Sequence, residues 1–231
     1  MTKNIKMLIR RAASVFCLGG MLLSAGLFTS CTEKDNTVEE FTNWQSKNET
    51  YWNKLYTTTQ QKIKSGDTSW KIILNYTFQN QKQTSGSALT YSPEDYIIAH
   101  VEQAGAGTAS PLYSDSVSMH YMGRLIPSTT YTAGLIFDKS WSSDTFNAAT
   151  SRPNHSYIGL SYDSKGKPIS LVDGFTTALM SMHRSDHWTV YIPYQLGYGA
   201  SASGIVPAYS TLIFDLRLVD FSHPGTKLKD S

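Results

Sequence analysis

The sequence predicts an α+β domain in which short strands are interrupted by one helix and preceded by a longer one. Beyond Tyr91 the chain consists of apolar or alternating runs separated by glycine, proline and serine, a pattern typical of half-buried strands. A single run of helical type, residues 175–182, interrupts them. Before the strands, residues 38–64 show helical periodicity and contain no proline or glycine.

The first 30 residues are typical of a secretory signal, because a basic start is followed by an uncharged apolar run from Ala12 to Phe28. The run is shorter than the roughly 20 apolar residues that a spanning helix needs. It ends in a stretch that resembles the bacterial lipobox, Leu27-Phe28-Thr29-Ser30-Cys31. The resemblance implies cleavage before Cys31 and lipidation of its thiol, which would tether the protein to a membrane. Ordinary signal cleavage and a retained helix are the alternatives.

Charge and cysteine content limit the function further. The chain has a net charge of +2, but residues 1–30 contain four basic and no acidic side chains, so the mature chain has a charge of −2. The basic balance therefore belongs to the leader and gives no indication of nucleic-acid binding. The two cysteines are Cys17 and Cys31, and cleavage would leave no pair for an internal disulfide.

After the cleavage site, residues 31–37 form a polar tether that cannot bury anything. The predicted helix over 38–64 has an aromatic stripe with two interpretations: it packs on its own domain, or it acts as a dimerisation or client-binding arm. The apolar residues at mostly helical intervals are Val38, Phe41, Trp44, Tyr51, Trp52, Leu55 and Ile63.

The remaining elements follow from composition and alternation. Residues 70–78 read as a strand and residues 80–87 as a loop. Further strands are expected at 96–101, 116–121, 187–192 and 211–221, and the 175–182 helix is opened by Asp173 and Gly174. We divide the chain into a signal (1–30), the tether (31–37), a helix and strand extension (38–90), a main domain (91–222) and a tail (223–231).

The segment from Asp95 to Phe221 resembles the FKBP-type peptidyl-prolyl cis-trans isomerase domain, and three blocks carry the match in family order. Each block alone is weak, and their joint occurrence in sequence is what identifies the family. This resemblance implies a curved antiparallel sheet wrapped around one short helix. The blocks are Ser116–Leu125 with Ile136–Ser140, Leu171–Phe175 with Ala178–Met182, and Tyr191–Gly199 followed by Ile205–Pro207 and Thr211–Asp215.

The resemblance implies an enzyme that isomerises X-Pro bonds in exported polypeptides without a cofactor. Rotation about the amide faces a barrier of about 18–20 kcal/mol because resonance keeps it planar. A twisted amide is less charge-separated than a planar one, so a pocket of low polarity favours it. A catalytically weak chaperone or partner-binding module that uses the same pocket is the alternative.

The family pattern also implies which side chains line this pocket. Asp138 corresponds to the pocket carboxylate, and the Val172 N–H and Tyr198 hydroxyl correspond to donors for substrate carbonyls. The residues implied in catalysis are Tyr121, Phe137, Asp138, Tyr198 and Phe214, and those implied in substrate binding are Leu171, Val172 and Phe175. From composition alone, Phe137 and Phe214 read as core residues, Tyr198 as part of a turn and Asp138 as a capping carboxylate.

Several positions depart from the family pattern. Phe175 stands where tryptophan is common, and Ser185 replaces the usual glycine in the turn after the helix. Residues 141–170 are longer than the compact pattern and lack its F-x-F segment, for which Phe146 and Tyr157 are the candidates.

The remaining sequence motifs give weaker indications of function. The four-residue spacing of His183 and His187 suits metal ligands on a helix, but no third ligand is nearby in sequence, so we expect no metal. The expected partners are proline-containing clients and, through the lipid, a membrane. The expected location is the cell envelope, at the outer membrane on its periplasmic or surface side.

Overall fold

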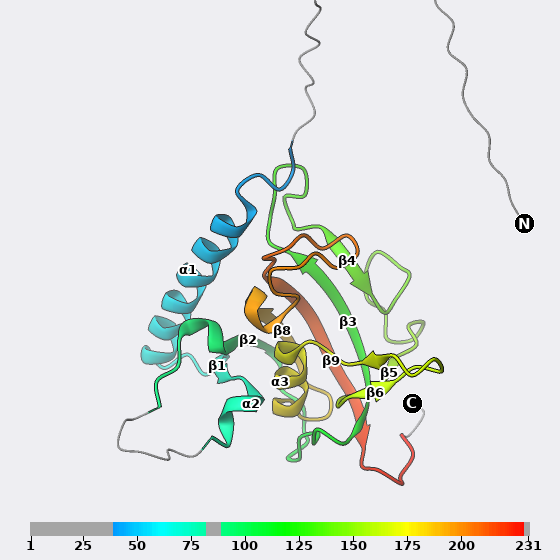
Figure 1. Ribbon diagram of the computed structural model, residues 1–231. Coiled ribbons are helices and arrows are strands. Elements are labelled where there is room, and N and C mark those ends of the chain that lie inside the picture. The colour runs from blue at the N-terminus through cyan, green and yellow to red at the C-terminus, as the bar shows by residue number, and fades with distance from the viewer. Residues whose placement is uncertain (1–38, 82–88, 229–231) are drawn as a thin grey trace, which may run out of the picture. The chain divides into compact units, whose positions relative to one another are not determined.

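The computed structural model describes residues 39–81 and 89–228, which are organised around one antiparallel sheet (Figure 1). The predicted signal, Cys31 and part of the predicted 80–87 loop lie outside the described residues. The seven strands of the main sheet are β1 (Trp70–Leu74), β2 (Tyr96–Gln103), β3 (Ser116–Leu125), β4 (Ile136–Lys139), β5 (Asn154–Tyr157), β8 (His187–Ile192) and β9 (Leu212–Ser222).

The strand order is β1-β2-β8-β9-β3-β4, and every neighbouring pair is antiparallel. The outer edge of β3 is shared: β5 pairs with Ser116–Met119 and β4 with Met122–Arg124. The chain between β4 and β5 therefore leaves the sheet before it returns to the same edge. The four strand predictions after Tyr91 are confirmed as β2, β3, β8 and β9.

The short helix α3 (Asp173–Ser181) packs on one face of this sheet, as Figure 1 shows. Six of its nine residues are buried. Gly174 permits the close approach, because a Cβ there would lie 2.3 Å from Cγ2 of Ile192 on β8. The expected fold class, an antiparallel sheet wrapped on a short helix, is confirmed.

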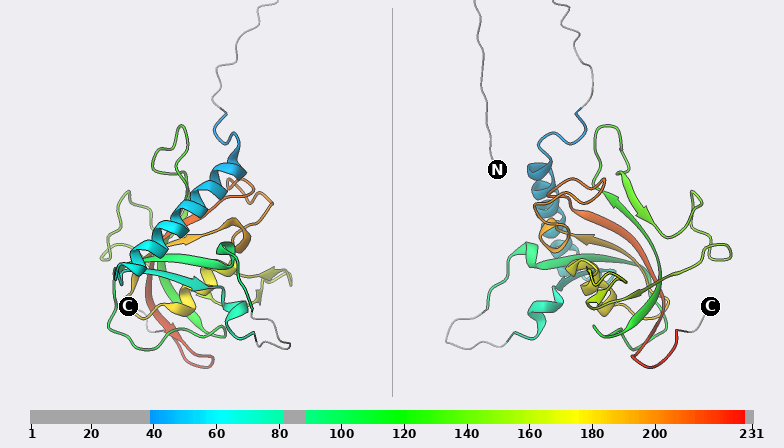
Figure 2. Two further views of the ribbon diagram at one scale, coloured as in Figure 1. Left: turned by 90° about the vertical axis from the view of Figure 1, so that its left-hand side faces the viewer. Right: turned by 45° about the vertical axis from the view of Figure 1, so that its right-hand side comes forward.

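The long helix α1 (Trp44–Lys64) lies on the other side of the sheet from α3 (Figure 2). It begins six residues later than predicted, because Asn43 adopts a left-handed conformation (φ 53°) that a helix cannot continue through. Trp44 and Trp52 are only 5% and 2% exposed. Their indole N–H groups donate to Ser210 Oγ (2.8 Å) and Pro93 O (3.2 Å). The aromatic stripe thus packs on its own domain.

The predicted strand over 70–78 is wrong in its second half. The chain turns at Asn75, whose N–H donates to Asp95 O (2.9 Å), and continues as the short helix α2 (Tyr76–Gln79). The N–H of Tyr76 donates to Thr177 Oγ1 on α3 (3.2 Å), so tertiary contacts end the strand.

Smaller elements complete the described chain. A separate hairpin joins β6 (Ser161–Tyr162) to β7 (Pro168–Ile169), and two 3₁₀ turns, η1 and η2, cover Pro93–Asp95 and Tyr194–Leu196. Among the helices of residues 39–81 and 89–228, none combines the length and the apolar composition that a membrane crossing needs.

Candidate active site

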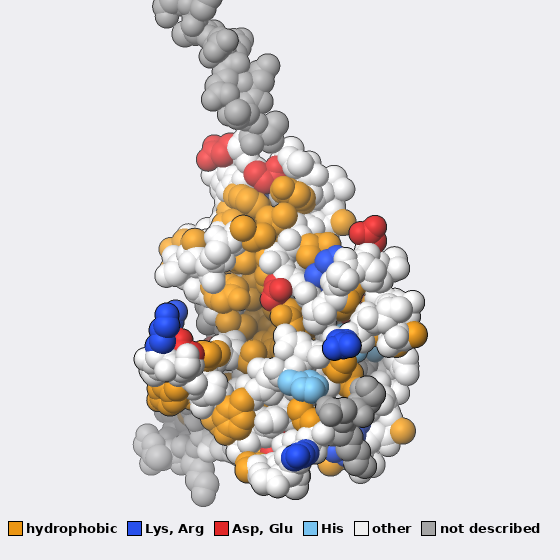
Figure 3. Space-filling model, turned by 90° about the vertical axis from the view of Figure 1, so that its right-hand side faces the viewer, with side chains coloured by type: hydrophobic (Ala, Val, Ile, Leu, Met, Phe, Trp, Pro, Cys, Tyr) orange, Lys and Arg blue, Asp and Glu red, His pale blue; other side chains and the backbone are white. Residues whose placement is uncertain are grey.

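A cavity of about 180 Å³ opens between the sheet and the N-terminus of α3. Figure 3 shows it as a hollow bordered by hydrophobic side chains with an acidic group at its edge. All eight side chains implied in catalysis or substrate binding line this cavity, although they come from β3, β4, β9, α3 and two connecting segments. Their roles stay predictions. The lining residues are Met119, Tyr121, Phe137, Asp138, Asn154, Ser156, Ser170, Leu171, Val172, Phe175, Tyr198 and Phe214.

Three phenylalanines form the floor of the cavity. Phe175 and Phe214 are 4% and 6% exposed, and their ring centroids are 4.8 Å apart. Phe137 meets Phe214 at 5.6 Å, and both pairs are edge-to-face, the geometry that aromatic quadrupoles prefer. Gly123 makes room for these rings, since a Cβ there would lie 2.4 Å from Cζ of Phe137. The floor is an apolar surface suited to a proline ring.

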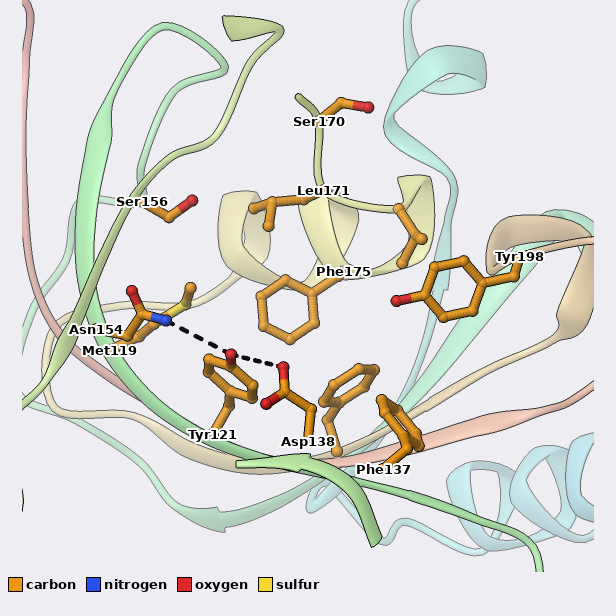
Figure 4. A pocket seen from close by; sticks show the side chains of 12 residues that line it. Met119, Tyr121, Phe137, Asp138, Asn154, Ser156, Ser170, Leu171, Phe175 and Tyr198 are labelled. Carbon is orange, nitrogen blue, oxygen red and sulfur yellow. Dashed lines mark hydrogen bonds between the residues drawn. The ribbon is translucent and has the colours of Figure 1, made fainter. Parts of the chain in front are cut away.

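One side of the cavity carries a linked tyrosine and carboxylate. The Tyr121 hydroxyl donates to Asp138 Oδ2 at 2.8 Å (Figure 4). Burial, followed by this hydrogen bond and the Asp138 charge, raises the pKa of Tyr121 to about 12. The phenol therefore remains protonated at neutral pH and orients the carboxylate.

Tyr198 faces this pair from the segment after η2, and Figure 4 shows its hydroxyl pointing into the cavity. Burial and the nearby negative charge of Asp138 raise the pKa of Tyr198 above its usual value. Its hydroxyl consequently stays protonated at neutral pH and can donate a hydrogen bond to a ligand.

The start of α3 provides a backbone donor at the cavity. Val172 is the N-cap residue of the helix, and its carbonyl accepts the N–H groups of Phe175 (2.9 Å) and Thr176 (3.0 Å). Within the described residues the N–H of Val172 has no hydrogen-bond partner. A donor at a helix N-terminus with no partner of its own is placed to bind a carbonyl oxygen.

The wall formed by β5 differs from the prediction. Phe146 and Tyr157, the candidates for an aromatic wall, do not line the cavity. Asn154 and Ser156 line it instead, and Asn154 Nδ2 lies 3.5 Å from the Tyr121 hydroxyl. These two residues, together with Met119 and Ser170, were missed. The alternation of Asn154 and Ser156 on one strand was the available signal.

Phe146 lies outside the candidate active site. Its ring lies 4.8 Å from that of His120 and 5.2 Å from that of Trp141, beside a second hollow. The spaced histidines are also separate: His187 Nε2 lies 3.1 Å from Asp215 Oδ2, and His183 Nδ1 lies 3.6 Å from Asp186 Oδ2. The described part of the chain holds no group of three or more His, Cys, Asp or Glu side chains suited to a metal ion.

An antiparallel sheet wrapped on a short helix, with an aromatic cavity between them, is the arrangement of an FKBP-like fold. Residues 107–219 match the family model described as FKBP-type peptidyl-prolyl cis-trans isomerase, and this part of the chain belongs to that family.

The chain is also similar to individual proteins. The chain is 30% identical over 149 residues to the macrophage infectivity potentiator of Trypanosoma cruzi, covering 64% of this chain and 63% of that protein. It is 30% identical over 125 residues to the peptidyl-prolyl cis-trans isomerase Mip of Coxiella burnetii, covering 52% and 42%. The solved structure of FkpA from Escherichia coli is 21% identical, with a TM-score of 0.47 and coverage of 79% and 63%. The chain thus spans less than two thirds of each of these proteins.

Proposed function

We propose that this protein is a peptidyl-prolyl cis-trans isomerase that acts on proline-containing polypeptides. The observation that carries the proposal is the convergence of the eight implied side chains on one cavity with an apolar floor and donors at its edge. The FKBP-type family of residues 107–219 supports the same activity.

Catalysis in this proposal needs no covalent step. The proline ring lies on Phe137, Phe175 and Phe214, where only apolar surface is offered. In this environment of low polarity the planar, charge-separated amide loses more solvation than the twisted amide does. The cavity therefore stabilises the transition state relative to the ground state, which is the requirement for a higher rate.

Two donors hold the peptide while its bond turns. The Val172 N–H and the Tyr198 hydroxyl bind carbonyl oxygens on either side of the reacting bond, and Asp138, held by Tyr121, faces the twisting amide. Fixing both flanks of the bond lowers the entropic cost of reaching the twisted geometry.

An assay on a proline tetrapeptide tests this activity. The full chain should increase the isomerisation rate above the uncatalysed reaction, which takes tens of seconds. Asp138→Ala should lower kcat/KM by about tenfold and Tyr198→Phe by about fivefold, as expected for a charged and a neutral hydrogen bond. Tyr131→Phe is the matched control, because Tyr131 is as exposed as Tyr198 but does not line the cavity.

The alternative is a partner-binding module of weak activity, and the replacement of an aromatic wall by Asn154 and Ser156 is the feature that favours it. The same assay separates the two. Folded protein that suppresses client aggregation but gives no rate above background would contradict the isomerase and favour the binding module.

The cellular setting is also a proposal. We infer that residues 1–30 are removed, that Cys31 is lipidated, and that residues 91–222 act as the isomerase domain in the cell envelope, at the outer membrane. Cys31→Ser should release the protein from membranes, and protease treatment of intact cells should distinguish surface display from the periplasmic side. A homodimer through α1 has less support, because Trp44 and Trp52 are buried in their own domain.

A further inference from the structure

The walls of the candidate active site differ sharply in chemistry. Its floor consists of phenylalanine rings, whereas the wall formed by β5 presents an amide and a hydroxyl. β5 pairs with β3 through Asn154↔Met119 and Ser156↔Val117, and alternate residues of a strand point to opposite faces. Asn154 and Ser156 therefore face the cavity together (Figure 4), and His155 between them does not line it.

This polar wall has unused hydrogen-bonding capacity. The only bond of the Asn154 side chain within the described residues is the long one from Nδ2 to the Tyr121 hydroxyl, at 3.5 Å. Its Oδ1 has no partner there. The Ser156 hydroxyl donates to the carbonyl of Tyr157 (3.2 Å), which leaves its oxygen free to accept. The wall can thus both donate to and accept from a bound side chain.

We propose that this wall selects prolines that stand next to a neutral hydrogen-bonding side chain, such as asparagine, glutamine, serine or threonine. This inference rests on the proposed isomerase activity and names the substrate class of that site. The proline ring occupies the phenylalanine floor, so the side chain of an adjacent residue reaches the Asn154 and Ser156 wall.

The physical reason is desolvation. An apolar side chain packed against the wall displaces water from the Asn154 amide and the Ser156 hydroxyl without replacing its hydrogen bonds, and that costs free energy. A side chain with its own amide or hydroxyl restores those bonds. A site built to bond a polar group discriminates against the isostere that lacks it.

Matched tetrapeptides test the selection. Asparagine is compared with leucine, and threonine with valine, at the position before the proline and again at the position after it. We expect kcat/KM to be higher for the polar member of each pair by about threefold to tenfold at one of the two positions, the ratio expected for a single net hydrogen bond.

Variants connect the ratio to the wall. The double variant Asn154→Leu with Ser156→Val should reduce the polar-to-apolar ratio to about one or below, and Asn154→Leu alone should reduce it in part. His155→Val is the control, because it adds apolar surface to the same strand away from the cavity and should leave the ratio unchanged. Thermal melting checks that each variant is folded.

The outcomes separate this inference from the proposed function. An active enzyme that turns over the leucine and valine peptides at least as well as their polar partners would overturn the selection but not the isomerase. An unchanged ratio in the folded double variant would do the same. No turnover of any peptide by folded protein would contradict the isomerase itself.

Discussion

Strand β3 separates two hollows of opposite character. Met119 and Tyr121 face the candidate active site, whereas His120 between them faces a groove on the other side of the sheet, as the alternation of a strand requires. The groove is larger, at about 430 Å³ against about 180 Å³. It lies between the sheet and the chain that leaves it after β4, and Phe146 and Arg217 are among its lining residues.

Two basic side chains that line the groove, His187 and Arg217, are paired with the carboxylate of Asp215 beside it. Arg217 Nε donates to Asp215 Oδ1 at 3.0 Å, and His187 Nε2 lies 3.1 Å from the other oxygen of that carboxylate. The Arg217 guanidinium also lies over the Phe146 ring, 4.3 Å from its centroid. His120 Nδ1 is buried without a partner in the described residues, and burial and the Arg217 charge lower the pKa of this imidazole.

The candidate active site shows the reverse arrangement. Its floor is apolar, and its polar groups keep bonding capacity for a ligand: the Val172 N–H, the Tyr198 hydroxyl and the Asn154 amide oxygen. Cavity volume alone therefore does not identify a site. Unused donors and acceptors around an apolar floor mark the smaller hollow as the one prepared for a substrate.

The largest difference between the two hollows is expected when one aromatic ring is removed from each. Phe214→Ala should lower the free energy of unfolding by about 3–5 kcal/mol, because removal of a buried ring leaves a cavity. The same change removes part of the apolar floor and should nearly abolish isomerase activity. Phe146→Ala should cost less, because Phe146 is half-buried, and should change kcat/KM by less than twofold. Urea denaturation and the tetrapeptide assay measure both effects.

Activity in folded Phe214→Ala equal to that of the unsubstituted chain would contradict the assignment of the floor. A loss of activity in Phe146→Ala that matches the loss in Phe214→Ala would show that the two hollows do not differ in function.

A smaller effect is expected from the pairing of Asp215 with His187 and Arg217 beside the groove. Burial alone would raise the pKa of Asp215, but the hydrogen bond from His187 and the His187 and Arg217 charges outweigh it and lower the pKa. A lowered pKa in the folded state gives stability above the unfolded value of about 3.9, and this stability is lost as the pH falls through the folded pKa. The unsubstituted chain should therefore be more stable than Asp215→Asn by up to about 1 kcal/mol at pH 7.

That difference should shrink below about pH 4, when the carboxylate becomes protonated. Urea midpoints of both proteins between pH 7 and pH 3 measure it. A difference that stays constant over this range would mean that the Asp215 charge does not stabilise the folded protein. Isomerase activity at pH 7 should be the same in both proteins, since Asp215 does not line the active-site cavity.

The sequence predicted those elements whose local pattern agrees with their tertiary surroundings. The run over 187–192 alternates between buried and half-exposed residues and coincides with β8, residue for residue. The second half of the predicted 70–78 strand failed because Asn75 and Tyr76 make hydrogen bonds to residues that are distant in sequence. Local periodicity in the sequence does not indicate such long-range hydrogen bonds.

The eight cavity residues were predicted from the family resemblance, because no local pattern shows that four separate elements and two connecting segments meet at one cavity. The β5 wall was missed for a related reason. The resemblance predicted aromatic side chains at this wall, Phe146 and Tyr157, but the pairing of β5 with β3 decides which residues face the cavity. A register shift of one residue would have placed His155 and Tyr157 there instead.

The smallest expected effect concerns Ser185, in the turn where the family usually has glycine. Ser185 has a φ of 68°, and its N–H donates to Leu218 O at 2.8 Å, so the sheet holds it in the left-handed region. That conformation costs a residue with a Cβ roughly 1–2 kcal/mol, whereas the added freedom of an unfolded glycine costs roughly 0.5–1 kcal/mol. Ser185→Gly should thus raise the free energy of unfolding by about 0.5–1 kcal/mol.

Ser151→Gly is the control, because Ser151 also lines the groove but has no positive φ. This change should lower the free energy of unfolding instead. Urea denaturation separates the two signs, and a loss of stability in both variants would mean that Ser185 bears no strain.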